Sequence, residues 1–515
     1  MKKTILTAIC GIGLMSVSCK EFLEPQSQNE FVPKTVQSLN ELLVSDVYLG
    51  PWDGSHHPMF TALGVFDDDV TWYDKEMEIR ESAQSTYEQM RLPYAWDDAM
   101  LTDMNGFGDT YETSYQRIVG CNVVLDYADD MHGSENERAK LKAQAYAMRA
   151  FYYFYLVNTY GKPYSFDKEA LGVPLKITSE FASSGIPRST VGKVYEQMVA
   201  DLQEAERLFM LLPEEEQWNP TAFKASLPMV QLLLSRVYLY MEEWENAIKY
   251  AEKVILNPNF QLLNLSTIEE PKINAENPYF DYHTAENPET IFLYGSFCDV
   301  IHLTGNFVIS EDNFNYPLFI PSESLLNSFV PSDLRKSRYI FQSAYNDRFP
   351  VGLRAVGKSK TQMGFKFYYG QPGHGWGGSL RLCEAYLNAI EGAIMLYKNG
   401  NHTYLAEALK RWDEFRQMRH TADYEKITTT DPDLLMDLIR RERRCELCFE
   451  HHRWFDIRRY GMEPLEHVWY SVKGEKVTYK LEKNDPGFTL LLPQSAIESN
   501  TNLEQNELRG KNGSK

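Results

Sequence analysis

Arginine and acidic side chains crowd one short stretch of this chain, residues 440–461, which reads RRERRCELCFEHHRWFDIRRYG. A planar guanidinium group can hold a carboxylate through two hydrogen bonds, so this composition predicts ion pairs. Glu446, Glu450 and Arg453 follow one another at steps of four and three residues, the spacing of neighbouring side chains on one helix. The stretch is therefore predicted to be a helix with many ion pairs beside a stripe of apolar side chains.

Carboxylates and histidines elsewhere could serve catalysis or bind a metal. The candidates are two aspartate runs, 67–69 and 97–98, and two histidine pairs, 56–57 and 451–452. Glycoside hydrolysis needs two spaced acids with distinct roles, but among 72 acidic residues such runs indicate little. No spaced acidic partner completes a metal site, and the chain lacks a Gly-x-Ser-x-Gly motif, a phosphate loop and a dinucleotide fingerprint. We therefore expect no enzymatic activity, no metal and no cofactor.

Aromatic residues mixed with glycine, proline and asparagine fill three long segments, 51–96, 274–327 and 339–378. Loops on a rigid scaffold often carry binding residues. A sugar lays its apolar C–H face on an aromatic ring, whereas its hydroxyl groups need polar partners. Trp376 stands among four glycines, which leave its ring little cover. Aromatic side chains are mostly buried, so we expect at least one of this set to contact a ligand. The candidate ligand-binding residues are Trp72, Tyr73, Trp96, Tyr279, Tyr282, Tyr316 and Trp376.

The formal net charge of -20 narrows the choice of partners. Nucleic acid phosphates would be repelled, and anionic lipid headgroups would not attract the chain by charge. The hydrophobic content of 43% is ample for a large core. Five cysteines remain besides Cys10 and Cys19. This number is odd and small for a chain of this length, so the sequence does not predict a disulfide framework.

The first residues read as a secretory signal, residues 1–18, with a basic start and a short apolar run. The signal ends at Cys19, which suggests lipoprotein processing with a lipid on that residue. Residues 19–34 read as a lipidated start and polar tether. At the other end, residues 508–515 are expected to form a disordered tail. A lipid on Cys19 would then anchor the chain to a membrane.

Hydrophobic periodicity predicts a mostly helical body. Residues 140–160 repeat apolar side chains at three- and four-residue steps, with Gly161 as the C-terminal cap. Thr190 is a plausible N-cap for the next helix. Residues 228–258 match the spacing of a tetratricopeptide unit, and residues 381–397 and 403–419 form a second helix pair. We expect a single body at 35–507, with helical repeats mainly within 114–258 and 380–460 and few short strands.

Several of these segments share an ordered set of motifs. The stretch at 440–461 contains ER-x-x-EL-x-FE-x-x-R-x-x-D-x-RR-x-G from Glu442, and residues 381–391 read RLxExYLNxxE. An Arg-Ala-Phe-Tyr-Tyr-Phe series begins at Arg149, and the chain closes on Asn-x-x-Leu-x-Gln-Asn from Asn500. In this order the motifs resemble those of the SusD/RagB family, the nutrient-binding surface lipoproteins of Bacteroidetes.

The resemblance implies an outer-membrane lipoprotein, exposed at the cell surface through the lipid on Cys19. Members of the family bind a glycan and pass it to a SusC-like TonB-dependent transporter, with the helical repeats against the barrel. Three alternatives remain open: a peptide ligand, as the RagB branch implies; a lipid-anchored glycosidase; and a purely structural repeat scaffold. The sequence does not indicate which glycan or peptide would be bound.

Overall fold

The computed structural model describes residues 33–51, 63–72, 81–100, 110–270, 282–296, 307–309, 315–317, 319–342, 354–356 and 376–509. The expected signal at 1–18, Cys19 and most of the expected tether lie outside these residues. So do Tyr73, Tyr279 and the end of the expected tail, 510–515.

The described part of the chain is mostly helical, which confirms the predicted fold class. The helices are α2 (Val36–Leu42), which continues into the π-helical turn η2 (Leu43–Val47), α4 (Glu81–Tyr94), α6 (Thr110–Tyr127), α7 (Glu135–Tyr160), α8 (Val191–Phe209), α9 (Leu227–Tyr240), α10 (Trp244–Ile255), α12 (Glu323–Leu326), α13 (Arg335–Tyr339), α14 (Leu382–Lys398), α15 (Tyr404–Gln417), α16 (Pro432–Leu447), α17 (Arg453–Arg459) and α18 (Gln494–Ser499).

The strands are short and form antiparallel pairs. The pairs are β1 (Val70–Trp72) with β7 (Phe319–Pro321), β2 (Leu171–Pro174) with β3 (Arg188–Thr190), β4 (Thr290–Ser296) with β10 (Trp376–Arg381), β5 (Phe307–Ile309) with β6 (Asn315–Pro317), β8 (Ile340–Gln342) with β9 (Arg354–Val356), and β11 (Leu465–Tyr470) with β12 (Lys476–Leu481). In the β4–β10 pair, Trp376 lies opposite Ser296, and a bulge follows Leu380.

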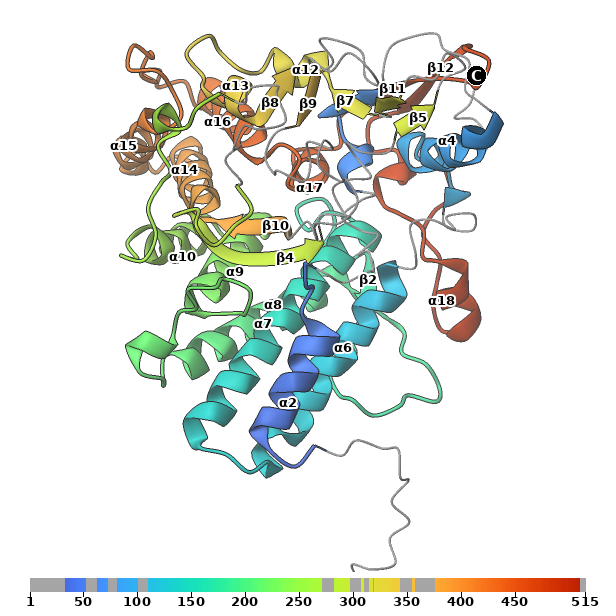
Figure 1. Cartoon of the computed structure of the whole chain (residues 1–515), viewed down its shortest axis with the longest axis vertical. Coiled ribbons are helices and arrows are strands. Elements are labelled where there is room, and N and C mark those ends of the chain that lie inside the picture. The colour runs from blue at the N-terminus through green and yellow to red at the C-terminus, as the bar shows by residue number, and fades with distance from the viewer. Residues whose placement is uncertain are drawn as a thin grey trace, which may run out of the picture.

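The helices pack one on the next through the molecule (Figure 1). α7 packs between α6 and α8, and α10 packs between α9 and α14. α14 in turn contacts α15 and α16. The two expected helix pairs, α9 with α10 and α14 with α15, are therefore present, an arrangement consistent with tetratricopeptide-type repeats. Within the described residues, no helix combines the length and the apolar character needed to cross a bilayer.

Local capping explains where the long helices begin and end. Ser134 and Glu137 form a reciprocal capping box at the start of α7, and Gly161 is its C-cap. The Thr190 side chain accepts a hydrogen bond from the backbone N–H of Lys193 at the start of α8, as predicted.

Residues 440–461 do not form one helix, so that prediction is wrong. α16 ends at Leu447 and α17 begins at Arg453. Between them, Phe449 and His451 adopt positive φ angles of 63° and 64°, which a right-handed helix does not allow. Ion pairs accompany the break, because Glu446 in the last turn of α16 and Glu450 within the break both bind Arg381 on β10.

One continuous cluster of buried hydrophobic side chains extends from Val36 to Leu503. A smaller cluster lies between α14, α15 and α16 and contains Trp412. The cysteines of the described part, Cys121, Cys383, Cys445 and Cys448, are all buried free thiols.

Within the expected tail, 508–515, one residue binds the body of the protein. The Arg509 side chain forms an ion pair with Asp485 at 2.9 Å and donates hydrogen bonds to the backbone carbonyls of Trp96 and Lys480. Arg509 is therefore bound to the body of the protein.

Candidate functional site

Three residues of the N-terminal motifs meet in a buried polar cluster between α6, α7 and α8. Arg149 on α7 donates two hydrogen bonds to the Asp201 carboxylate on α8, at 2.6 and 2.8 Å. A third goes to the side-chain oxygen of Asn122 on α6, at 2.7 Å. A buried charge is tolerated when it is paired and hydrogen-bonded, as here. This cluster therefore fastens three helices to one another.

The motif residues of α14 have the same kind of role. Each points into the protein and binds a polar side chain from another helix. The pairs are Glu384 with Arg236 of α9, Asn388 with Arg443 of α16, and Glu391 with Arg459 of α17. The two bonds between Arg236 and Glu384 are both 2.6 Å long. These residues hold the helical scaffold together and do not face solvent.

Glu446 lies at the centre of the largest ion-pair network. Arg419 donates to its carboxylate at 2.8 Å, and Arg335 and Arg381 each donate at 3.3 Å. Burial alone would disfavour the charge, but these arginines hold the pKa of Glu446 well below its ordinary value. Arg381 and Arg419 also bind Glu289. The network therefore connects β10, α13, α16 and the segment that follows α15.

Among the described residues, one group of side chains has the donor types and spacing of a metal site, namely Glu289, Cys383 and Glu446. Both carboxylates already bind arginines. Burial also raises the pKa of the Cys383 thiol well above its ordinary value, whereas a metal needs the thiolate. These residues are therefore better explained by the ion-pair network than by a metal.

The aspartate run at 67–69 likewise binds arginines of the signature stretch. Arg453 contacts Asp68 at 2.7 Å, and Arg444 contacts Asp69 at 2.7 Å. Asp67 and Asp69 are buried. Burial, with Asp69 and Asp68 nearby, raises the pKa of Asp67 well above its ordinary value. The run thus fastens the segment before β1 to α16 and α17.

Two of the predicted ligand residues, Trp72 and Trp96, belong to the core. Trp72 is 2% exposed and packs on Trp469, with 4.6 Å between ring centroids. Trp96 is 1% exposed and stacks on His467 at 4.0 Å, and its indole N–H donates to the Phe66 carbonyl. Neither ring offers a face to a ligand, so the expectation for these residues is corrected.

Tyr282 is buried too, with its ring edge-on to Tyr339 at 5.0 Å, and is corrected in the same way. Trp376 is only partly buried, at the start of β10. Tyr316 lies on β6 opposite Val308, and its side chain is not among those the structure describes. Trp376 therefore remains a candidate for ligand contact.

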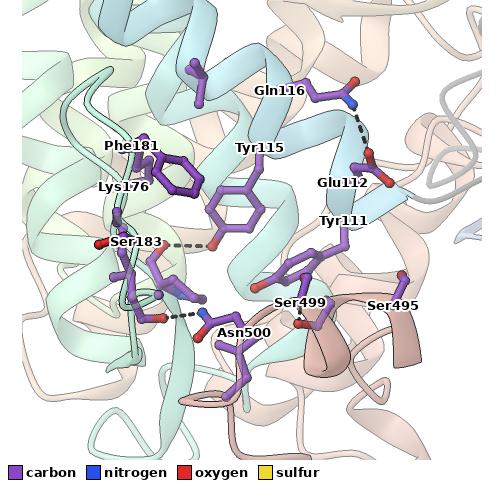
Figure 2. Close-up of a pocket in the computed structure, with 17 residues that line it drawn as sticks. Tyr111, Glu112, Tyr115, Gln116, Lys176, Phe181, Ser183, Ser495, Ser499 and Asn500 are labelled. Carbon is purple, nitrogen blue, oxygen red and sulfur yellow. Dashed lines mark hydrogen bonds between the residues drawn. The ribbon is translucent and has the colours of Figure 1, made fainter.

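The structure adds a groove that sequence reasoning missed. It lies between α6, the segment 174–187 and α18, with a volume of about 780 Å³ (Figure 2). Tyr111 and Tyr115 form one side, with ring centroids 4.7 Å apart. Phe181, which is 91% exposed, stands on the opposite side. We call this feature the α6 groove.

Polar groups at the rim of the α6 groove are held in place by hydrogen bonds. The Tyr115 hydroxyl donates to the Pro174 carbonyl at 2.7 Å, and the Asn500 amide donates to the Ile186 carbonyl at 2.8 Å. The Gln116 amide donates to Glu112. Aromatic faces with fixed polar groups beside them can bind a sugar ring or an apolar peptide side chain.

Only weak signals in the sequence point to this groove. Tyr111 and Tyr115 are four residues apart, which places both rings on one face of a helix. Phe181 precedes small and polar residues up to Gly185, a composition typical of a loop. The contribution of Asn500 comes from more than 300 residues further along the chain, and nothing local predicts it.

Family models match most of the described chain. A model described as "Starch-binding associating with outer membrane" matches residues 21–239, and the SusD family model matches residues 370–508. A SusD-like protein of Formosa agariphila is 23% identical over 447 residues, which cover 79% of this chain and 81% of the relative. The chain belongs to the SusD/RagB family.

Solved structures share the same fold. A SusD superfamily protein from Bacteroides thetaiotaomicron is 24% identical, with a TM-score of 0.66 over 92% of this chain and 100% of that one. A structure from Bacteroides vulgatus, titled a SusD-like carbohydrate binding protein, is 20% identical with a TM-score of 0.65 over 92% and 99% of the two chains.

Proposed function

We propose that this protein is a surface lipoprotein that binds an oligosaccharide and delivers it to a SusC-like TonB-dependent transporter in the outer membrane. The observation that carries the proposal is family membership through both halves of the chain, including a model described as starch-binding and outer-membrane-associated. The lipid on Cys19 would hold the protein at the membrane. The ligand would be bound and released without chemical change.

The binding surface that we propose has two parts. The α6 groove supplies aromatic faces from Tyr115, which is half-buried, and Phe181, on which the apolar face of a sugar can stack. Trp376 supplies a third, partly exposed ring at the start of β10. Aromatic side chains have only two side-chain torsion angles, so they lose little conformational entropy when a ligand binds, which favours them in a binding protein.

A peptide ligand is the second candidate, and one observation favours it. The α6 groove has no tryptophan in its lining, and it carries an acidic and a basic side chain, Glu112 and Lys176. Such a groove also suits an apolar peptide side chain with charged neighbours. Glycosidase activity is less well supported, because the aspartates at 67–69 are buried or bind arginines.

The experiment is calorimetric titration of soluble glycans into Phe181→Ala and a matched control, Phe166→Ala. Phe166 is also exposed, at 50%, but it does not line the groove. We expect Phe181→Ala to weaken glycan binding by about tenfold, because a stacked ring is lost, and Phe166→Ala to leave it unchanged. Equal affinities for both variants and wild type would place the glycan elsewhere.

A further inference from the structure

A second cavity lies between α2, the first turns of α7 and the segment 216–226. Its volume is about 510 Å³, within the range of roughly 300–1,000 Å³ that is usual for small-ligand sites. It shares no lining residue with the α6 groove. We call it the α2–α7 cavity.

A buried amide in this cavity has a hydrogen-bond donor to spare. Gln144 lines the cavity and is 3% exposed. The Tyr48 hydroxyl accepts the backbone N–H of Ala225 at 3.0 Å and donates its own proton to the Gln144 carbonyl oxygen at 2.9 Å. This chain of hydrogen bonds fixes the orientation of the amide, because an amide nitrogen at that position would leave the Tyr48 proton without an acceptor. The Gln144 NH₂ group then has no protein partner among the described residues.

The cavity also contains an ammonium group without a counter-charge. Lys224 lines it, and no carboxylate of the described part of the chain pairs with this lysine. Burial, and then the nearby charge of Lys140, lower the pKa of Lys224. Lys140 itself lines the cavity and binds Glu216 at 3.2 Å. Because Lys140 is already paired with Glu216, Lys224 is the cation of this lining that can attract an anionic ligand.

Aromatic and amide side chains complete the wall. Trp218 is held edge-on to Phe260, with 6.2 Å between ring centroids, and Phe223 lies nearby in the same lining. The side-chain oxygen of Asn219, Oδ1, accepts a hydrogen bond from the Thr221 backbone N–H at 3.0 Å, which leaves the Asn219 NH₂ group without a partner among the described residues. Glu137 and Glu216 also line the cavity, but Glu137 accepts hydrogen bonds from Ser134, and Glu216 accepts one from Lys140. The wall therefore offers ring faces, amide donors and the ammonium group of Lys224.

We propose that the α2–α7 cavity binds a saccharide unit that carries an anionic group, a carboxylate or a sulfate ester. Lys224 and Lys140 would hold the anionic group, the amides of Gln144 and Asn219 would donate to ring oxygens or hydroxyls, and Trp218 would stack on the sugar. The choice of a saccharide rests on the proposed function, whereas the preference for a negative charge comes from Lys224, with which no carboxylate of the described residues forms an ion pair.

The test compares Lys224→Gln with a matched control, Lys162→Gln. Each lysine places its ammonium group 5.7 Å from the centre of a phenylalanine ring, but Lys162 is exposed and does not line the cavity. Digalacturonate, galactose 6-sulfate and neutral digalactose are titrated calorimetrically into the wild type and both variants, at low and high salt. Thermal unfolding is measured in parallel to verify that both variants are folded.

We expect Lys224→Gln to weaken binding of at least one anionic sugar by about tenfold, and Lys162→Gln to leave it unchanged. Added salt should weaken the same interaction in the wild type, and whichever anionic sugar responds identifies the anionic group. Anionic sugars that bind both variants alike would overturn this inference alone, provided that neutral glycans still bind the protein. Failure of every glycan to bind the wild type would overturn the proposed function as well.

Discussion

The arginines of the signature stretch, residues 440–461, bind carboxylates supplied by distant parts of the chain. Arg453 binds Asp68, Arg444 binds Asp69, and Arg459 binds Glu391. A buried ion pair adds little net stability, because desolvation offsets the attraction, but loss of one partner leaves a buried charge uncompensated. At the scale of single residues, the motifs that identify this family are therefore structural.

This account predicts the effect of breaking one pair. Arg236→Met should lower the free energy of unfolding by about 3–5 kcal/mol, because it leaves the buried Glu384 without its partner. The double variant Arg236→Met, Glu384→Met should recover most of that loss. Lys398→Met, which breaks an exposed pair with Asp433, should have little effect. Chemical denaturation measures the free energy of unfolding of all three variants, and an Arg236→Met variant as stable as wild type would contradict the account.

Stability should also depend on the histidines of the break in the signature stretch. Burial, and then the neighbouring His283, lower the pKa of His451 to about 3. The unfolded chain binds a proton near its ordinary pKa of about 6.5 while the folded chain does not, so stability is full above that pH and is lost as the pH falls. Each such histidine contributes a slope of about 1.4 kcal/mol per pH unit between pH 6.5 and 4. Burial also lowers the pKa of His452.

His451→Asn tests this contribution, since asparagine tolerates the positive φ at that position. The denaturation midpoint, measured from pH 7 to pH 4.5, should fall less steeply in the variant than in the wild type. If the midpoints of the variant and the wild type fell equally with pH, His451 would bind a proton equally in the folded and the unfolded state, which would contradict this prediction.

Two tryptophans show where the prediction of ligand-binding residues from the sequence failed. Trp72 and Trp96 occur in segments of loop-like composition, which is why we expected exposed rings. Both are buried by partners far along the chain, Trp469 and His467 on β11, and a local pattern does not reveal such partners.

At the scale of elements, the C-terminal motif closes the molecule on its N-terminal helices. The Asn506 amide donates to the backbone carbonyls of Tyr160 and Leu490, and its oxygen accepts from Arg188 at 2.8 Å. Gln505 makes two hydrogen bonds to the backbone of Leu492. The end of the chain thus caps the region where α7 ends and β3 begins.

Asn506→Ala should therefore lower the free energy of unfolding by about 1–3 kcal/mol, because three buried or half-buried polar groups lose a partner. Glu507→Ala, at the exposed neighbouring position, serves as the control. Equal denaturation midpoints for the two variants would show that the closing motif does not stabilise the fold.

The long helices were predictable because their apolar periodicity and caps are local features. α7 ends at Tyr160 before Gly161, and α8 begins after Thr190, as the sequence indicates. The break between α16 and α17 was not predictable in this way. Glu446 and Glu450 are four residues apart in the sequence, but Glu450 lies beyond the end of α16. Their partners, Arg419 after α15 and Arg381 in β10, lie far from them in the chain, and no local pattern reveals these ion pairs.

At the scale of the whole molecule, a helical scaffold held by buried ion pairs carries the α6 groove, the α2–α7 cavity and the partly exposed Trp376. Family membership was predictable because the order of the motifs survives in the sequence. The α6 groove was not, since α6, the segment 174–187 and α18 come together only in the folded chain (Figure 2).

The most direct test of the central claim is calorimetric titration of the lipid-free chain, starting after Cys19, against a panel of polysaccharides and short peptides. The account predicts saturable binding of at least one glycan, weakened by about tenfold in Phe181→Ala or Trp376→Ala, where a stacked ring is lost. Saturable binding of peptides, with no response to any glycan in the panel, would contradict it.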